Sequence, residues 1–95
     1  MAFVSVSTWK WKEGVDEEEL RENARQKFNY LKTLGVTRQM SVRISDNESM
    51  IVSEWPSLAA REAAMEKVMA MRSDIKDEGM VELSGEMMGE VEFEV

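Results

Sequence analysis

The order in which hydrophobic patterns follow one another constrains the fold of this chain more than any single residue does. Residues 3–11 alternate as a strand does, and residues 16–34 carry apolar side chains at helical spacing. Two short alternating runs follow over residues 39–45 and 49–55, and a second helical pattern begins at Ser57. The last five residues alternate again. The predicted order is therefore strand, helix, strand, strand, helix, strand.

The first helix has the clearest boundaries. Asp16 is a favourable N-cap residue, and Glu19 three positions later completes a capping-box pattern. Gly35 favours the end of the helix, because glycine readily takes the left-handed conformation found there. One buried stripe is expected, made of Leu20, Ala24, Phe28, Leu31 and Leu34.

A hairpin and a second helix are predicted next. The second strand alternates in such a way that its buried side chains are expected to be Met40, Val42 and Ile44. Pro56 disfavours a helical conformation at the preceding residue, so the third strand ends at Trp55. Ser57 then caps the second helix, whose expected buried residues are Ala60, Ala64, Val68 and Met71.

The carboxyl-terminal third has weaker signals. We expect a short helix around residues 75–83, broken at Gly79 and ended by a turn at residues 84–85. The final strand is expected over residues 88–95, where apolar residues alternate with glutamates.

These elements together predict an α+β fold of the ferredoxin-like βαββαβ type. Such a fold has a four-stranded antiparallel sheet with two helices on one face. The 95 residues contain no linker-like segment, so we expect a single domain over residues 1–95. A chain of this length buries only a small core, and a partner subunit would add stability.

Composition excludes several classes of function. The chain has no His and no Cys, which removes disulfides, thiolate nucleophiles and sulfur ligands for metals. No spacing of acidic residues resembles a calcium loop, so we expect neither a metal site nor a cofactor. The net charge of −7 would repel phosphate backbones, so nucleic acid is not an expected partner. Residues 1–11 do not resemble a signal peptide and the composition argues against a membrane span, so we expect a cytoplasmic protein.

Three stretches of the chain resemble a known family. They are residues 9–14 before the acidic helix start, residues 53–57 around Trp55, and the alternating residues 91–95. In these the chain resembles the dimeric α+β-barrel superfamily, and within it the antibiotic-biosynthesis-monooxygenase-like proteins. The resemblance implies a homodimer with paired sheets and a small-molecule pocket between sheet and helices in each subunit. Some members oxidise aromatic polyketides with molecular oxygen and no cofactor, whereas others degrade haem, isomerise small substrates or have no assigned activity.

The haem-degrading branch of that family does not fit. Its members have an Asn late in the first strand, a Trp within the second helix and a His near the end of that helix. Here Ser7 stands in place of the Asn, Ala63 and Ala64 occupy the region of the Trp, and the chain has no His. A proximal His ligand to haem iron is therefore absent.

The first strand presents two different faces. Val4 and Val6 form an aliphatic face that suits a packed sheet surface, such as the seam of a barrel. On the other face Ser5 and Ser7 lie between large aromatic residues, and small side chains there would leave a hollow lined by hydroxyl groups. The alternative is an ordinary, half-solvated strand face.

Further residues complete the expected pocket. Trp55 is expected either in the core or at the rim of the pocket, and Tyr30 is expected either to bind a ligand oxygen or to reach water. Met65, Met69 and Met71 of the second helix are expected either to form a flexible wall of the pocket or to pack in the hydrophobic core. The full set of expected pocket residues is Ser5, Ser7, Trp9, Phe28, Tyr30, Trp55, Met65 and Met69.

Two functions remain open from the sequence. The first is a cofactor-independent oxygenase of an aromatic or polyketide-like compound, with Ser7, Tyr30 and Arg72 as candidate catalytic hydrogen-bond donors. The second is a non-catalytic ligand-binding or stress-related protein with the same dimeric fold. A buried donor facing an open cavity favours the enzyme, and a pocket filled by the protein's own Trp and Met side chains favours the binding protein.

Overall fold

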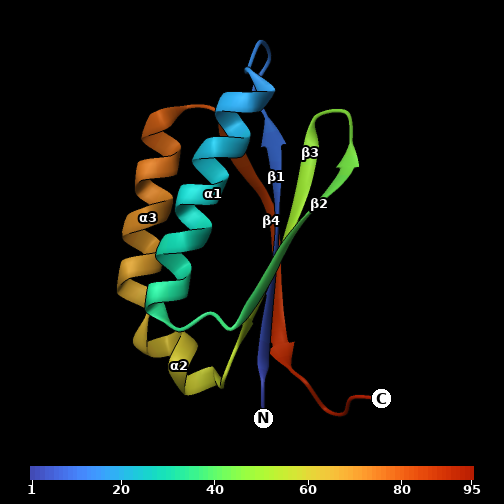
Figure 1. Ribbon diagram of the computed structural model, residues 1–95, viewed down its shortest axis with the longest axis vertical. Coiled ribbons are helices and arrows are strands. Elements are labelled where there is room, and N and C mark those ends of the chain that lie inside the picture. Colours follow the sequence, from blue (N-terminus) through green and yellow to red (C-terminus); the bar gives the residue numbers. More distant parts are fainter.

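The computed structural model of the protein describes residues 1–95, and its four strands form one antiparallel sheet in the order β2-β3-β1-β4. Its elements in chain order are β1 (Phe3–Trp11), α1 (Glu17–Leu34), β2 (Arg38–Ser45), β3 (Glu48–Trp55), α2 (Leu58–Ala63), α3 (Met65–Glu78) and β4 (Val81–Glu90). All three helices cover the same face of the sheet (Figure 1). This is the predicted ferredoxin-like arrangement. None of the helices is both long and apolar enough to cross a membrane.

The ends of α1 follow the capping signals. The Asp16 side chain accepts hydrogen bonds from the backbone amides of Glu18 and Glu19, at 2.9 and 3.2 Å. At the other end Gly35 has a φ of 119°, and its amide donates to carbonyl groups of the last helical turn. A left-handed backbone of this kind strains residues with a side chain, so glycine fixes where the helix ends.

The second helical segment differs from the prediction in two ways. It is divided at Ala64 into α2 and α3, and α3 continues to Glu78. Gly79, with a φ of 72°, ends the helix there, so the expected short helix around residues 75–83 is wrong. Val68 and Met71 are buried as expected.

The position of the last strand was also wrong. Strand β4 covers Val81–Glu90, whereas Val91–Val95 form a tail outside the sheet. In β4, Gly85 and Gly89 occupy positions opposite Thr8 and Val4, and the pairing with β1 shifts register between Thr8 and Trp9. The glycines and the register shift interrupt the alternation of apolar and polar residues in β4. The tail does have that alternation, although it forms no strand.

The core is small and lies toward the end of the molecule that holds α2 and the amino terminus (Figure 1). Its buried apolar residues are Phe3, Leu31, Val36, Trp55, Ala64, Val68 and Met71. Trp55 is the least exposed of them, at 1 %.

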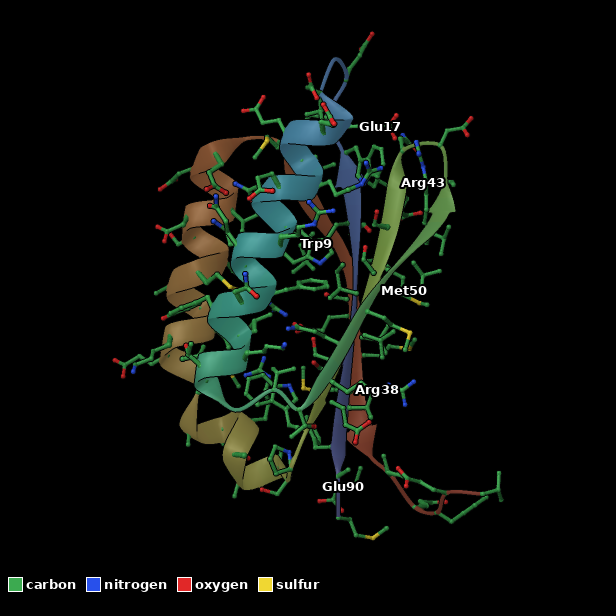
Figure 2. All side chains as sticks on the ribbon, viewed as in Figure 1. Trp9, Glu17, Arg38, Arg43, Met50 and Glu90 are labelled. Carbon is green, nitrogen blue, oxygen red and sulfur yellow. The ribbon has the colours of Figure 1, made fainter.

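The sheet has an apolar face that no helix covers, which we call the outer face. Met40 pairs with Val52 across β2 and β3, and Val52 pairs with Val6 across β3 and β1. Figure 2 shows Met50 of this face on the side of the sheet opposite to Trp9, which points toward α1. The predicted burial of Met40 and Ile44 is therefore wrong for a single chain, in which both are exposed.

Candidate functional site

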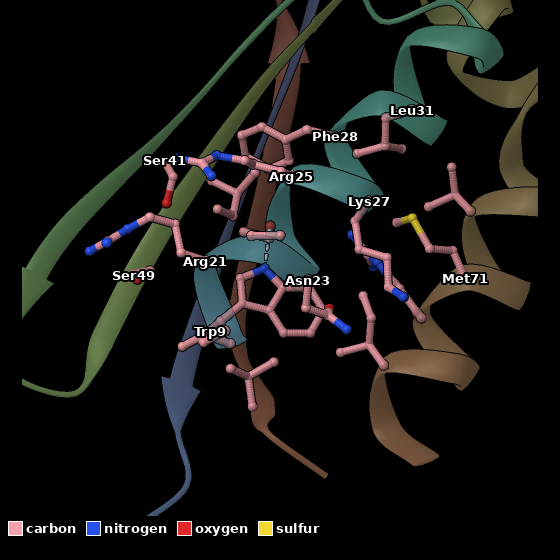
Figure 3. A pocket seen from close by; sticks show the side chains of 18 of the residues that line it. Trp9, Arg21, Asn23, Arg25, Lys27, Phe28, Leu31, Ser41, Ser49 and Met71 are labelled. Carbon is pink, nitrogen blue, oxygen red and sulfur yellow. Dashed lines mark hydrogen bonds between the residues drawn. The ribbon is translucent and has the colours of Figure 1, made fainter. Parts of the chain in front are cut away.

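A cavity of about 510 Å³ lies between the inner face of the sheet and helices α1 and α3 (Figure 3). The apolar core closes one of its ends through Trp55, Leu31, Val68 and Met71. Trp9, Trp11 and Phe28 add aromatic walls. The volume falls within the range of sites that bind small organic molecules.

The cavity exists because serines occupy the inward positions of three strands. Ser5 of β1 lies opposite Ser53 of β3, and Ser7 lies opposite Ile51, which in turn faces Ser41 of β2. Large aliphatic side chains at such positions would fill the space beneath α1. Short hydroxyl side chains leave it open and give it a polar floor.

Two of these serines are held by tryptophan side chains. Trp9 Nε1 donates to Ser7 Oγ at 2.8 Å (Figure 3), and Trp11 Nε1 donates to Ser49 Oγ at 3.0 Å. A hydroxyl that accepts from an indole still has its own proton to donate. Neither hydroxyl proton has a protein acceptor, so Ser7 and Ser49 are available as donors to a ligand.

The cavity is basic although the protein is acidic. Half of the 12 lysines and arginines of the chain line it, but only one of the 19 acidic residues does, namely Glu17. The basic lining residues are Arg21, Arg25, Lys27, Arg43, Arg61 and Arg72. Such a concentration of one charge favours ligands of the opposite charge.

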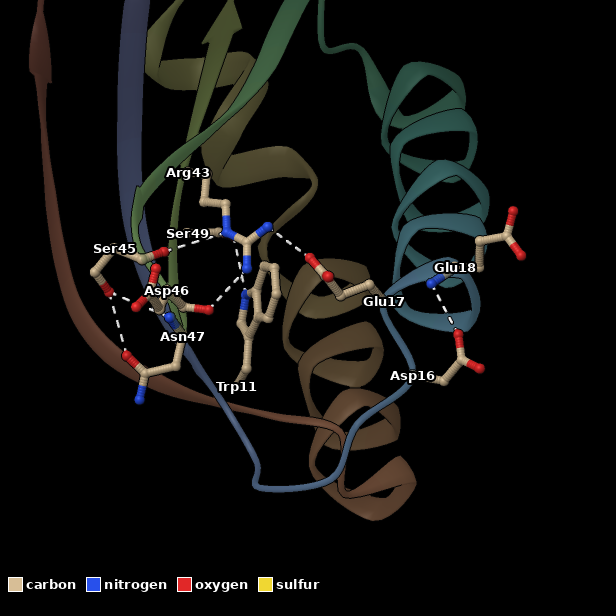
Figure 4. A network of polar contacts seen from close by, with 9 residues as sticks. All are labelled: Trp11, Asp16, Glu17, Glu18, Arg43, Ser45, Asp46, Asn47 and Ser49. Carbon is tan, nitrogen blue, oxygen red and sulfur yellow. Dashed lines mark hydrogen bonds and ion pairs between the residues drawn. The ribbon is translucent and has the colours of Figure 1, made fainter.

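Acidic residues pair with several of these cations. Arg43 donates to Glu17 at 2.5 Å and lies over the Trp11 ring, 4.4 Å from its centroid (Figure 4). Its remaining donors contact backbone carbonyl groups of the β2–β3 turn. Lys27 pairs with Glu78 of α3 at 3.0 Å. These pairs join α1 to β2 and to α3.

Arg72 has a carboxylate partner on β4, outside the lining of the cavity. Its guanidinium donates to Glu86 of β4 in an ion pair whose side chains are mostly buried. This hydrogen bond, with the charge of Arg72 and of Arg61, holds the pKa of Glu86 below its usual value despite the opposing effect of burial.

Arg61 has no carboxylate partner. It is 2 % exposed, its one side-chain hydrogen bond goes to the sulfur of Met65 at 3.3 Å, and its guanidinium lies 5.6 Å from the centroid of the Trp55 ring. Burial and then the neighbouring Arg72 lower the pKa of Arg61, and Glu86 opposes them. The Nε1 of the adjacent Trp55 is buried and has no acceptor.

The structure brings most of the predicted site residues together. Ser5, Ser7, Trp9, Phe28, Trp55 and the candidate Arg72 all line the cavity. Tyr30, Met65 and Met69 lie outside it and are exposed. Tyr30 is two positions beyond Phe28, which turns it to the opposite side of α1. We therefore remove these three residues from the expected pocket.

Several lining residues were not predicted. Arg61 is the most informative, since it precedes Ala64 and Val68 at helical spacing and so lies in the apolar stripe of the second helical segment. A charged residue within such a stripe is the signal that would have identified it. Ser41 was not assigned to the pocket because the buried side of β2 was expected to be the opposite one, and Ser49 of β3 was not assigned to it either. Among the described side chains, no group of acidic residues is arranged to hold a metal ion.

Comparison with solved structures places this architecture among known proteins. SnoaB, a cofactor-independent oxygenase from Streptomyces nogalater, matches with a TM-score of 0.72 at 14% identity, over 99% of this chain and 96% of its own. The structural-genomics protein YJCS matches with a TM-score of 0.69 at 15% identity, over 96% of this chain and 99% of its own. The chain shares their fold. HapK from Hahella chejuensis also matches, with a TM-score of 0.64 at 19% identity, over 96% of this chain and 92% of its own.

These matches confirm the predicted resemblance at the level of the fold. No family model and no curated protein matches the sequence itself. At these identities the likeness concerns architecture, so the activity has to be argued from the side chains of the cavity.

Proposed function

We propose that this protein is a cofactor-independent oxygenase acting on an electron-rich aromatic small molecule of the polyketide type. The observation that carries the proposal is the open cavity, which combines aromatic walls with hydroxyl and guanidinium donors. Aromatic walls bind a flat ring system, and the donors stabilise negative charge on its oxygen. The fold shared with a cofactor-independent oxygenase supports the same activity.

In this mechanism the substrate supplies the electrons that activate oxygen, and the protein stabilises the ionised form of the substrate. Ser7 and Arg72 are the residues proposed for this role, since both line the cavity. The Ser7 hydroxyl is oriented by Trp9 Nε1, and Arg72 carries a positive charge that lines the same cavity. Fixed donors of this kind stabilise a developing oxyanion without having to reorganise.

The absence of a strong base defines the substrate further. The chain has no His, and the hydrogen bond from Arg72 makes the Glu86 carboxylate a weaker base by lowering its pKa. Proton removal therefore depends on an acidic substrate, such as a phenol or an enol whose anion the cavity stabilises.

Oxygen uptake tests the proposed activity. Anthrone and polyphenolic compounds should consume oxygen in the presence of the purified protein without added metal, flavin or haem. Ser7→Ala should reduce the rate on the order of 100-fold, because one preorganised donor to the oxyanion is lost. Tyr30→Phe removes a hydroxyl outside the cavity and is the matched control, with an unchanged rate.

Two outcomes would contradict the proposal. Equal rates for the wild-type protein and Ser7→Ala would remove Ser7 from the mechanism. Tight ligand binding without oxygen uptake across the whole panel would instead favour the alternative of a non-catalytic binding protein.

We also propose that the protein works as a homodimer in which two outer faces pack together. The outer face carries Val4, Val6, Met40, Val42, Met50, Val52 and Met87 across all four strands. Thr8, Glu54 and Arg38 lie on the same face, which is otherwise apolar. An exposed apolar surface of this extent is unusual for a monomer and typical of an interface.

The surface area of the chain agrees with this assembly. A folded monomer of 10.9 kDa exposes about 5,600 Å² by the usual scaling with mass. This chain exposes 6394 Å². The outer face, the cavity and the carboxyl-terminal tail all contribute to the excess.

A further inference from the structure

We infer that the ligand of this cavity carries a carboxylate group, and that Arg61 and Trp55 bind this group at the inner end of the cavity. The inference rests on the proposed function insofar as it names a group that the substrate must carry. It concerns binding, so it can be tested without turnover.

The first argument is the unbalanced charge at this end of the cavity. Arg61 and Arg72 both lie near a single carboxylate, that of Glu86, and Arg72 binds it directly. One positive charge therefore remains without a partner, on a side chain that is 2 % exposed. A buried charge without a counter-charge is costly for the folded protein. A bound monoanion would neutralise it, whereas a dianion such as a phosphate ester would create the opposite excess.

The second argument is the number of unused donors. A guanidinium group has five N–H donors, and the one side-chain hydrogen bond of Arg61 goes to a thioether sulfur, which is a weak acceptor. The Trp55 Nε1 beside it is buried and has no acceptor at all. A carboxylate offers two oxygens with the planar geometry that a guanidinium binds in a bidentate manner.

The third argument is access. Arg61, Arg72 and Trp55 all line the 510 Å³ cavity, which continues past Phe28 and Trp9. Because Arg61 and Trp55 are only 2 % and 1 % exposed, the carboxylate reaches them as side chains at the inner end move apart, while the ring system lies between the aromatic walls. The oriented hydroxyl of Ser7 would then lie along the ring system, separate from the carboxylate site.

A matched pair of probes tests the inference. The acid 3-hydroxy-2-naphthoate and its neutral carboxamide have nearly the same shape, and isothermal titration measures the affinity of each. The wild-type protein should bind the acid at least tenfold more tightly, because charged hydrogen bonds are stronger than neutral ones. Arg61→Met should abolish this preference. Lys67→Met removes an exposed positive charge of α3 outside the cavity and should leave the preference within about twofold of wild type.

Thermal unfolding gives an independent readout. Without ligand, Arg61→Met should melt at the wild-type temperature or above it, because a buried charge without a partner has been removed. If Arg61→Met fails to fold, Arg61→Gln replaces it in the titration. The melting temperature of the wild-type protein should in either case rise with the acid and not with the amide.

Three results would overturn the inference. They are equal affinity of the wild-type protein for acid and amide, no binding of either probe at millimolar concentration, and a preference for the acid that survives in the Arg61 variant. Different results would contradict the proposed oxygenase activity. A preference for the acid without any oxygen uptake would contradict that activity and support the carboxylate site. Oxygen uptake at equal rates with and without a carboxylate on the substrate would support the activity and contradict the carboxylate site.

Discussion

Single residues decide which part of the inner sheet face becomes core and which part becomes cavity. At one end Phe3 and Trp55 face the helices and are buried. Two residues further along β1 the inward position holds Ser5, and four residues further it holds Ser7. The same strand therefore packs tightly at its start and leaves space in its middle, because its inward side chains change from large to small.

The Arg72–Glu86 pair predicts how stability depends on pH. Because the pKa of Glu86 is lowered in the folded state, the unfolded state binds more protons at acidic pH. The pair therefore stabilises the fold fully above the ordinary glutamate pKa of about 4.3, and this contribution is lost as the pH falls through the lowered value.

Urea unfolding between pH 7 and pH 3 measures this contribution. Glu86→Gln should be less stable than wild type at neutral pH and should lose less stability on acidification. Glu82→Gln changes an exposed carboxylate on the same strand and serves as the control. The assignment fails if Glu86→Gln and wild type lose the same free energy of unfolding over this range.

At the scale of elements, the sequence predicted those whose signals are local. The bounds of β1 and α1 and the end of β3 follow from alternation, capping residues and Pro56. Strand β4 was misplaced because its identity depends on pairing with β1, which is distant in the sequence, and because Gly85 and Gly89 interrupt its pattern.

Helix α1 covers the cavity and is held at several points along its length. Arg43 of β2 binds Glu17 in its first turn, Gln39 donates to the Phe28 carbonyl at 2.7 Å, and Leu31 packs in the core. The first turns depend on the polar contacts, since the apolar core lies toward the other end of the helix. We therefore expect these turns to open more readily than the rest of α1.

Hydrogen exchange tests this view of α1. Arg43→Ala removes the bond to Glu17 and the contact with Trp11, and should speed exchange of amides in the first two turns about two- to fivefold, as expected for a partly exposed pair. Arg25→Ala removes an exposed pair within the same helix and is the control. If both variants exchange like wild type, β2 does not hold down the start of α1.

At the scale of the whole molecule, the sequence predicted a hollow with hydroxyl groups but not its charge. Ser5 and Ser7 indicated the hollow because both lie on one strand beside aromatic residues. The basic lining was hidden, since its members come from β2, α1, α2 and α3 and meet only after folding. The net charge of −7 does not indicate a basic cavity, because most acidic residues lie away from the cavity.

The proposed dimer gives the last prediction. Met87 is 73 % exposed in a single chain and lies opposite Val6 on the outer face. Met87→Glu should leave the folded monomer intact, because the side chain already meets water there. In a two-fold dimer it would place a carboxylate from each chain against an apolar surface, and burial of an unpaired charge is unfavourable.

Sedimentation velocity at micromolar concentration distinguishes the two cases. The wild-type protein should sediment as a dimer and Met87→Glu as a folded monomer, with circular dichroism confirming that the fold is kept. Met69→Glu, at a position on α3 that is 43 % exposed, adds the same charge away from the outer face and should remain dimeric. A wild-type protein that is monomeric and fully folded would overturn the assembly. A Met87→Glu variant that is as dimeric as wild type would instead mean that the two copies associate through another surface, because the outer face cannot bury two carboxylates without a loss of affinity.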